Sequence, residues 1–166
     1  MVQYAEYSSP LGKLLLTGDG LSLTGLYMGK SAPRGAFSGN DPVLEQAKLW
    51  LDAYFRGEDP ALTFSLNPCG TEFQKLVWSR LLEIPKGCVR TYGDIGKEIA
   101  RIQGREKMSA QAVGRAVGHN PISMIIPCHR VMGANGNLIG YAWGLDKKIW
   151  LLRHEGWLKE ETHDHQ

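Results

Sequence analysis

Hydrophobic and polar residues alternate in short runs over the first part of the chain, and turn-forming residues separate the runs. Between residues 3 and 28, Ser-Pro, Gly-Asp-Gly and Thr-Gly interrupt runs of strand-like composition, which is the pattern of hairpins. The segment 41–59 follows a helical period instead. Asp-Pro marks the start of the predicted helix and Gly57 marks its end. We therefore predict a small antiparallel sheet with one amphipathic helix packed on it. The inward-facing helix positions are Val43, Ala47, Trp50, Leu51 and Tyr54.

The hydrophobic period is helical through most of the second half, and we place a domain boundary near Asn67. The first helix there starts after Thr71, which can act as its N-cap, and ends before Pro85. Its predicted buried face consists of Phe73, Leu76, Val77, Leu81 and Leu82. The sequence thus predicts an α+β fold with an N-terminal sheet-plus-helix domain, 1–67, and a mostly helical C-terminal domain, 68–166.

Two shorter helices joined by a loop are predicted next. The first, in "TYGDIGKEIARI", opens with a Thr-x-x-Asp sequence similar to a capping box and places Ile95, Ile99 and Ile102 on one face. Ser109 can cap the second, "AQAVGRAVG". Two short helices joined by a turn predict a helix-turn-helix motif.

The second of these helices has an unusually thin outer face. Its inward positions are Ala110, Val113 and Val117. The opposite face carries Gln111, Gly114, Arg115 and Gly118, with Ala112 and Ala116 beside it. Such small residues either let helices pack closely or let a nucleic-acid backbone or a narrow groove approach.

Composition and charge describe an ordinary globular protein with one basic half. The 166 residues are 43% hydrophobic and 22% charged, and no apolar run approaches the roughly 18 residues of a membrane span. The opening residues lack the order of a signal peptide, so we expect a cytoplasmic protein without membrane contact. The net charge is only +2, but residues 71–153 carry thirteen basic and six acidic side chains. This basic half is expected to contact a polyanion, unless its charges form an ordinary solvated face.

The three cysteines do not form a recognisable framework. Cys69, Cys88 and Cys128 are too few and too scattered for a set of disulfides, and no Cys-x-x-Cys pair indicates a zinc site. We therefore expect free thiols in a reducing compartment and no metal ion.

Cys128 has chemically interesting neighbours. It lies in "MIIPCHRVMG", where an apolar run that Pro127 ends predicts a buried strand. A nucleophilic cysteine needs a positive or proton-accepting group such as His129 or Arg130, whereas an isolated cysteine is more often a small buried hydrophobic residue. Adjacent side chains of an extended chain point to opposite sides, so His129 needs a turn after Pro127 or a bridging water to act. Glu155, in "LLRHEGW", could orient His129 as the acid of a triad, although acids at helix ends are mostly solvated.

Five segments between Thr71 and Gly156 match one known family in order and spacing. They are "FQKLVWSRLLEIPKG", "TYGDIG", "AVG", "NPISMIIPCHRVMG" and "GYAWGLDKKIWLLRHEG". In these segments the chain resembles the O6-alkylguanine-DNA alkyltransferases, also called methylated-DNA–protein-cysteine methyltransferases. The string "IPCHRV" is the most specific of them. The N-terminal sheet and helix are compatible with the family's first domain but add little to the resemblance.

The resemblance implies direct DNA repair in a single turnover. Cys128 would take the alkyl group from O6 of guanine and keep it, and no cofactor is needed. By the same resemblance, His129 acts as a base through a water and Glu155 orients His129. Asn120 would brace the turn between the DNA-binding helix and the cysteine.

The resemblance also implies that the damaged nucleotide rotates out of the duplex. Tyr92 matches a tyrosine that crowds the target phosphate and donates to a ring nitrogen of guanine. The backbone at Cys128 and Val131 would bind the exocyclic amine. Tyr141 and Ala142 would form the lip near O6.

Three features depart from the family pattern. Gln111 stands where the family commonly has an arginine that fills the space left by the flipped nucleotide, and Arg115 cannot take that role by spacing. Trp143 stands at the pocket rim where some members have glycine, and its bulk should restrict large alkyl groups. The loop "RIQGREKMSA" is longer than usual and adds three basic residues. The predicted DNA-binding residues are Gln111, Ala112, Gly114, Arg115, Arg101, Arg105, Lys107 and Arg130.

We expect a monomer whose partner is double-stranded DNA containing O6-alkylguanine; the sequence leaves open whether O4-alkylthymine is also repaired. One alternative is a non-catalytic sensor of alkylated DNA or a helix-turn-helix regulator, but such sensors typically lack the cysteine. A thiol hydrolase is a second alternative, without the signature of an oxyanion hole or acyl pocket. A zinc site built from Cys69, Cys88, Cys128 and His129 has the wrong spacing.

Overall fold

The computed structural model describes residues 2–39 and 41–159, and the chain forms two compact units. The first unit consists of the residues up to Lys75 together with His119–Ile126, and the second contains the remaining described residues. No sequence pattern predicted that residues 119–126 return to the first unit. The predicted domain boundary near Asn67 stays a prediction.

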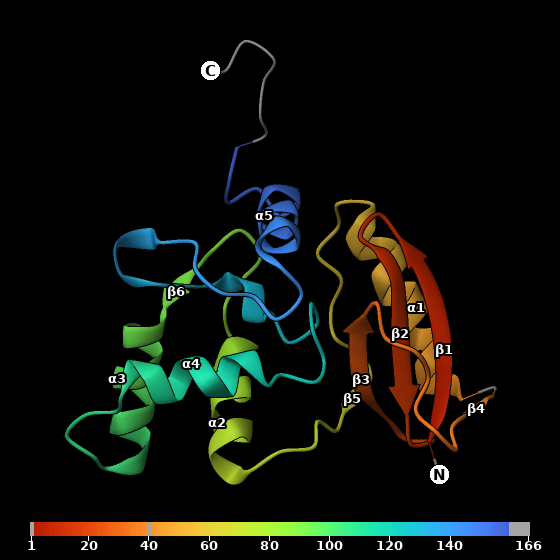
Figure 1. Cartoon of the computed structure of the whole chain (residues 1–166), viewed down its shortest axis with the longest axis horizontal. Helices are drawn as coiled ribbons and strands as arrows, with labels where there is room; N and C mark the ends of the chain where they lie inside the picture. Colours follow the sequence, from red (N-terminus) through yellow and green to blue (C-terminus); the bar gives the residue numbers. More distant parts are fainter. Residues whose placement is uncertain (1, 40, 160–166) are drawn as a thin grey trace. The chain divides into compact units, whose positions relative to one another are not determined.

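The first unit is built around a five-stranded sheet, in which β1, β2 and β3 pair antiparallel (Figure 1). The short strands β4 and β5 pair parallel with β1 and β3 at the two edges. The bounds are β1 Gln3–Ser9, β2 Gly12–Gly18, β3 Ser22–Met28, β4 Phe37–Ser38 and β5 Ser65–Leu66. The predicted antiparallel hairpins are confirmed, whereas the parallel pairing at the edges was not predicted.

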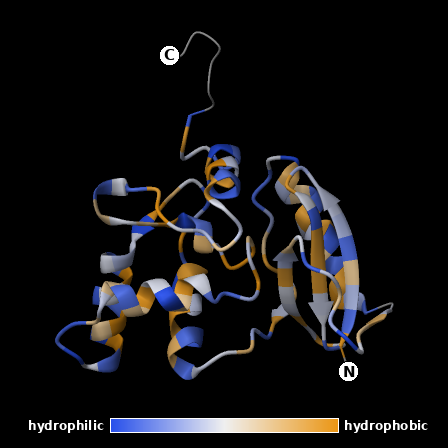
Figure 2. Ribbon diagram, viewed as in Figure 1, coloured by the Kyte–Doolittle hydropathy of each residue, from blue (hydrophilic) through white to orange (hydrophobic). Residues whose placement is uncertain are grey.

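Helix α1, Pro42–Phe55, packs on this sheet as predicted. Asp41 caps the helix, because one carboxylate oxygen accepts a hydrogen bond from the backbone of Val43 at 3.0 Å and the other from Gly20 at 2.9 Å. Trp50 differs from the prediction, since it is only half-buried and its indole donates to the carbonyl of Pro60 at 3.2 Å. Figure 2 shows a hydrophobic stretch within β2, the strand in the middle of the sheet. The buried helix residues are Val43, Leu44, Ala47, Leu51, Ala53 and Tyr54.

Residues 119–126 run beside β3 in the same unit. Leu26 forms a parallel bridge with Ile122, and its backbone N–H donates to the carbonyl of Pro121 at 2.9 Å. A buried strand was expected here, but the segment forms a series of turns, with Met124 buried at a φ of 71°. The chain therefore reaches Cys128 through a compact turn rather than an extended run.

The second unit is mostly helical, and its only regular pairing among the described residues is the parallel pair β6–β7. Helices α3 and α4 pack against each other as the predicted helix-turn-helix (Figure 1). No helix within the described ranges is long and apolar enough to cross a lipid bilayer. The bounds are α2 Glu72–Leu81, β6 Arg90–Thr91, α3 Tyr92–Gln103, α4 Ala110–Gly118, η1 Cys128–Arg130, β7 Val131–Met132, η2 Ala134–Gly136 and α5 Leu145–His154.

The predicted caps fix the starts of α3 and α4. The hydroxyl of Thr91 accepts a hydrogen bond from the backbone of Asp94 at 3.0 Å. Gly104 ends α3 in the left-handed conformation, with a φ of 70°, which glycine adopts without a steric penalty. The hydroxyl of Ser109 accepts from the backbone of Gln111 at 3.1 Å and so starts α4. The turn between the helices is thus determined locally.

Some burial assignments in this unit were wrong. Leu82 is 39% exposed because α2 ends one residue earlier, and Leu76 is only half-buried. Ala110 is exposed as the first residue of α4. Ala116 is buried instead, and its carbonyl accepts a hydrogen bond from the indole of Trp78 in α2 at 2.8 Å. The inner face of α4 is therefore rotated from the predicted one.

Candidate active site and nucleic-acid interface

Cys128 begins the short 3₁₀ helix η1 directly after Pro127. The predicted strand would have sent the side chains of Cys128 and His129 to opposite sides. In a 3₁₀ helix, with three residues per turn, successive side chains are instead about 120° apart. Cys128 is 5% exposed and His129 is completely buried. The structure therefore has a turn after Pro127, which is one of the two conditions under which His129 could act on Cys128.

Glu155, the residue that follows α5, binds both residues that come after Cys128. Its Oε2 lies 2.6 Å from Nε2 of His129 and 3.1 Å from Nη2 of Arg130. Its Oε1 accepts from Nε of Arg130 at 2.7 Å, and Nη1 of Arg130 donates to the carbonyl of Ile84 at 2.6 Å. One buried carboxylate therefore holds an imidazole and, by a bidentate pair, a guanidinium.

Burial and charge together fix the ionisation of this group. Burial alone would raise the pKa of Glu155, but His129 and Arg130 outweigh burial and hold the pKa well below its usual value. Burial lowers the pKa of His129 below its usual 6.5, and this effect outweighs the raising effect of the Glu155 charge. At neutral pH Glu155 is therefore a carboxylate whose charge Arg130 balances, and His129 is a neutral imidazole.

The neutral imidazole can take only one tautomer in this arrangement. An ionised carboxylate accepts hydrogen bonds and has none to donate, so the proton of His129 must sit on Nε2, which faces Glu155. Nδ1 then carries a lone pair, and it is a buried atom without a hydrogen-bond partner among the described residues. The site thus holds a buried base with a fixed orientation on the residue next to a cysteine.

Arg130 was predicted to bind DNA, and the structure corrects that prediction. Its guanidinium points into the unit, where Glu155 and Ile84 use its donors, and the residue is 9% exposed. A side chain held in this way is not presented to a phosphate backbone. The burial of Arg130 could not be predicted from its position two residues after Cys128. An arginine is rarely buried unless it is paired, and nothing near it in the sequence indicated a partner.

Asn120 organises the turn that leads to the cysteine. It is buried, its Nδ2 donates to the carbonyl of Ile126 at 2.8 Å, and its Oδ1 accepts from the backbone of Ile122 at 2.9 Å. Ile126 lies two positions before Cys128. Both ends of the amide therefore bind backbone in the segment that precedes the nucleophile candidate.

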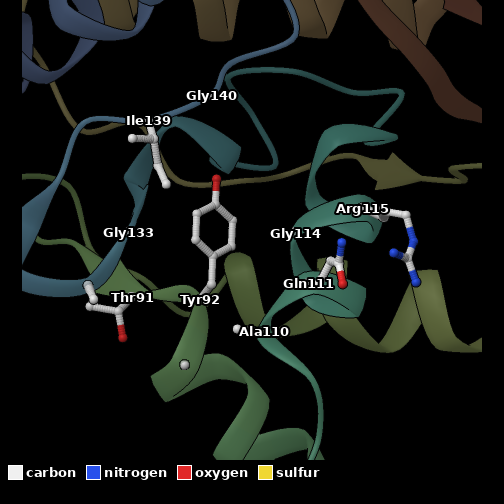
Figure 3. Close-up of a pocket in the computed structure, with 11 residues that line it drawn as sticks. Thr91, Tyr92, Ala110, Gln111, Gly114, Arg115, Gly133, Ile139 and Gly140 are labelled. Carbon is white, nitrogen blue, oxygen red and sulfur yellow. The ribbon is translucent and has the colours of Figure 1, made fainter.

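A cavity of about 680 Å³ opens in the second unit, between the start of α3, the outer face of α4 and the loop after β7 (Figure 3). Its size is within the usual range for small-molecule sites. The wall from α4 consists of Ala110, Gln111, Gly114 and Arg115. The facing walls consist of Thr91, Tyr92, Gly93, Gly133, Ala134, Ile139 and Gly140.

Tyr92 stands at the centre of this cavity, and its hydroxyl points toward Gly140 (Figure 3). A Cβ atom at Gly114 would lie 3.8 Å from the Tyr92 ring, so the glycine lets α4 pass close to the tyrosine. Burial, together with the negative charge that Cys128 can carry, raises the pKa of Tyr92 above its usual 10. The hydroxyl is therefore a hydrogen-bond donor at neutral pH, and the thiol lies within electrostatic range of it.

The structure brings some of the predicted DNA-binding residues to this cavity and leaves others apart. Gln111 and Arg115 line it and are exposed, and in Figure 3 the guanidinium of Arg115 is directed away from Tyr92. Ala112 is half-buried outside the lining. The predicted loop residues Arg101, Arg105 and Lys107 are all exposed, in the last turn of α3 and in the loop before α4.

The other predicted substrate-binding residues lie in and after β7, the strand that follows the cysteine. Val131 is completely buried in β7, and neither it nor Cys128 lines the cavity. Tyr141, Ala142 and Trp143 form the loop that leads to α5, and only Ala142 among these three is exposed. The rim of the cavity is instead formed by the preceding residues of the same loop.

The cysteines do not gather into a metal site. Cys69 and Cys88 are exposed, whereas Cys128 is buried. Within the described part of the chain, no group of three or more histidine, cysteine or acidic side chains is arranged to hold a metal ion.

Lys148 is a completely buried residue that sequence reasoning missed. It lies three and four positions before Leu151 and Leu152, both of which are buried. This spacing places all three on the inner face of α5 and was the signal that could have identified the lysine.

Two family models together match most of the chain. Residues 72–157 match "6-O-methylguanine DNA methyltransferase, DNA binding domain". Residues 2–68 match "6-O-methylguanine DNA methyltransferase, ribonuclease-like domain".

Curated proteins and solved structures agree with these matches. A methylated-DNA–protein-cysteine methyltransferase of Methanosarcina acetivorans is 48% identical over 157 residues, which cover 92% of this chain and 97% of that protein. A Mycobacterium tuberculosis protein of the same name is 42% identical and covers 93% of each chain. The crystal structure of Mycobacterium tuberculosis OGT in complex with DNA superimposes with a TM-score of 0.80 at 42% identity, covering 92% of both chains.

The lowered pKa of His129 predicts how stability depends on pH. Below about pH 6.5 the unfolded chain binds a proton that the folded chain does not, so the free energy of unfolding should fall as the pH falls from 7 to 5, by at most about 1.4 kcal/mol per pH unit. Urea unfolding at several pH values measures this slope, which should be flatter in His129→Gln. His119→Gln makes the same change at an exposed histidine and is the matched control. An equal slope in wild type and His129→Gln would show that His129 is charged in the folded protein.

Proposed function

The chain belongs to the family of methylated-DNA–protein-cysteine methyltransferases, and we propose from this premise that Cys128 is the cysteine that receives the alkyl group. The protein is a DNA-repair enzyme that moves an alkyl group from DNA to one of its own cysteines and is thereby used up. The strongest support for Cys128 as the alkyl acceptor is the buried, hydrogen-bonded series Arg130–Glu155–His129. This series leaves Nδ1 of His129, the residue next to Cys128, able to accept a proton. The proposed substrate is O6-alkylguanine in double-stranded DNA.

The reaction is an in-line displacement at the alkyl carbon. Sγ of Cys128 forms a bond to that carbon while the bond from the carbon to O6 breaks, and the electron pair of the broken bond stays on guanine. The thiol proton passes through a bridging water to Nδ1 of His129, in the way expected of a general base. Guanine takes up one proton from water and His129 releases to water the proton that it received, so the net products are S-alkylcysteine and unmodified guanine.

Tyr92 supports the departure of guanine. Its hydroxyl remains protonated at neutral pH and donates a hydrogen bond to a ring nitrogen of the base as negative charge develops there. The tyrosine also crowds the target phosphate at the mouth of the cavity, which favours an extruded nucleotide. Flipping costs a few kcal/mol of stacking and pairing.

The remaining pocket residues orient the base and the nucleophile. The backbone of Cys128 and Val131 accepts hydrogen bonds from the exocyclic amine of guanine, and Tyr141 and Ala142 form the lip near O6. Trp143 limits the space for the alkyl group. Asn120 keeps the turn before the cysteine in one conformation; this role is supported by its two backbone hydrogen bonds. Its truncation would leave buried backbone groups unsatisfied.

DNA approaches along α4, whose Gly114 and Ala112 offer little obstruction to a narrow groove. Gln111 fills the space that the flipped nucleotide leaves and hydrogen-bonds the orphaned base without adding charge. Arg115 and the loop residues Arg101, Arg105 and Lys107 contact phosphates. A cytoplasmic monomer is sufficient for this reaction, and sedimentation of the free protein tests the monomeric state.

The test of the proposed function is transfer to one defined cysteine. After incubation with an oligonucleotide that carries O6-methylguanine, mass spectrometry should find one added methylene on the Cys128 peptide. Cys128→Ser should abolish the transfer because the hydroxyl is a far weaker nucleophile, and Cys88→Ser, at an exposed cysteine, should leave it intact. DNA binding without transfer by the wild-type protein would favour a sensor instead.

Gln111→Ala should reduce repair of duplex DNA more than repair of single strands, because only the duplex contains a stack from which the nucleotide must be removed. The expected loss on duplex DNA is about tenfold, which corresponds to about 1.4 kcal/mol. Single-turnover rates on both substrates measure it. Gln103→Ala, at another exposed glutamine near the end of α3, is the control. Equal losses on the two substrates would remove the proposed role.

Replacing Arg101, Arg105 and Lys107 by alanine should flatten the salt dependence of DNA binding. Each lost phosphate contact lowers the slope of log affinity against log salt by about 0.9. Binding titrations between low and moderate salt measure the slope. The control removes three basic residues of the first unit, Lys13, Lys48 and Arg56, each of which has an acidic partner there. If both triple variants keep the wild-type slope, the loop residues are ordinary solvated charges.

A further inference from the structure

A half-buried cluster of three charged side chains joins three elements of the second unit. Glu98 of α3 is at its centre. Its Oε2 accepts a hydrogen bond from Nη1 of Arg80, in α2, at 3.2 Å, and its Oε1 accepts one from Nη1 of Arg90, in β6. Nη2 of Arg90 donates to the backbone carbonyl of Asp94 at 3.2 Å. One carboxylate therefore connects α2 and β6 with α3.

The contacts of Arg90 enclose Tyr92 on both sides. Arg90 lies two residues before the tyrosine, and Asp94 lies two residues after it. The three residues between them all line the cavity. Arg90 also stands opposite Val131 in the pairing of β6 with β7, and β7 directly follows the turn that carries Cys128. A displacement of Arg90 would therefore move Tyr92 relative to Cys128.

Tyr92 needs such support because it is the first residue of α3, and helix ends are the parts of a helix that fray. The backbone of Asp94, in the first turn, is held at both of its polar groups. The hydroxyl of Thr91 binds its N–H, and the guanidinium of Arg90 binds its carbonyl. The cap orients the start of the helix, whereas only Arg90 connects it to Glu98 and, through Glu98, to α2.

The charges of the cluster favour the paired arrangement. The hydrogen bond from Arg90, with a further contribution from Arg80, lowers the pKa of Glu98 below its usual 4.5, although partial burial opposes the decrease. Glu98 is therefore ionised at neutral pH. The three side chains are between 24% and 33% exposed, and water screens ion pairs of this kind, so each adds little to stability. A guanidinium nevertheless binds its acceptors in fixed directions. The cluster is thus better suited to fixing a geometry than to stabilising the fold.

We propose that Glu98 is a positioning residue that acts through Arg90 and holds the hydroxyl of Tyr92 where it can donate to the departing base. This inference rests on the proposed function. Glu98 does not line the cavity, so it affects the rate of alkyl transfer without touching the substrate.

The first test compares Glu98→Gln, which removes the charge and keeps the size of the side chain, with Glu83→Gln, the same change at an exposed glutamate just after α2. Transfer to Cys128 by the wild-type protein is established first, so failure of the proposed function is recognised separately. Single-turnover rates on duplex DNA with O6-methylguanine are measured at saturating protein, together with DNA affinity and melting temperature.

Glu98→Gln should lower the rate at saturation by about tenfold, because a small displacement of a group that contacts the reacting base is costly. DNA affinity should be nearly unchanged, and Glu83→Gln should match the wild type in every measurement. A wild-type rate for Glu98→Gln, or a loss confined to DNA affinity or melting temperature, would overturn the proposal.

A double-mutant cycle tests whether Glu98 acts through Tyr92. Tyr92→Phe removes only the hydroxyl and should slow transfer by itself. In the Tyr92→Phe background, Glu98→Gln should cause no further loss of rate, because the group that it positions is already absent. A merely structural role does not depend on the hydroxyl and gives losses that multiply. Losses that multiply would therefore contradict the proposal.

Arg90→Met provides a second cycle that applies even if Glu98→Gln does not fold. This change removes the connection to Tyr92 and leaves Glu98 paired with Arg80, so it creates no unpaired carboxylate. Arg90→Met should slow transfer when the Tyr92 hydroxyl is present and should have no effect on the rate in the Tyr92→Phe background. Equal losses with and without the hydroxyl would show that the cluster does not position Tyr92.

Discussion

The arrangement of the candidate active site depends on one buried carboxylate. Glu155 sits between a guanidinium, which balances its charge, and an imidazole, which can donate to it from only one nitrogen. Without Arg130 the carboxylate would be a buried unpaired charge, and without Glu155 neither the tautomer nor the orientation of His129 would be fixed. The pairing of Arg130 with Glu155 therefore allows His129 to be neutral, so that it can accept a proton.

Helix α5 and the residue that caps its C-terminus supply two side chains that organise the site. Lys148 and Glu155 are seven positions apart, which is close to two helical turns, so they face the same side at different heights. Glu155 acts on the turn η1, and Lys148 acts on β7 and the loop after it. The turn that carries the nucleophile and the rim of the cavity are thus both hydrogen-bonded to side chains of the same helix or its cap. A precise site usually needs such a rigid support.

Much of this could be predicted from sequence, for identifiable reasons. Hairpin turns and the capping residues Thr91 and Ser109 act locally, so their patterns were sufficient for the sheet, α1 and the helix-turn-helix. The role of Arg130 could not be predicted, because its burial depends on Glu155, 25 positions away, and on the carbonyl of Ile84. A strand was predicted where the structure has a turn at Met124, because apolar composition does not distinguish a buried strand from a buried turn. Lys148 was overlooked because a lysine is expected at the surface.

The most direct test of the central claim is the protonation state of the His129 ring, observed by ¹⁵N NMR of the folded protein at neutral pH. The account predicts a neutral imidazole with its proton on Nε2 and an unprotonated Nδ1. A ring that carries its proton on Nδ1, or on both nitrogens, would contradict it, because Nδ1 could not then accept the proton of Cys128.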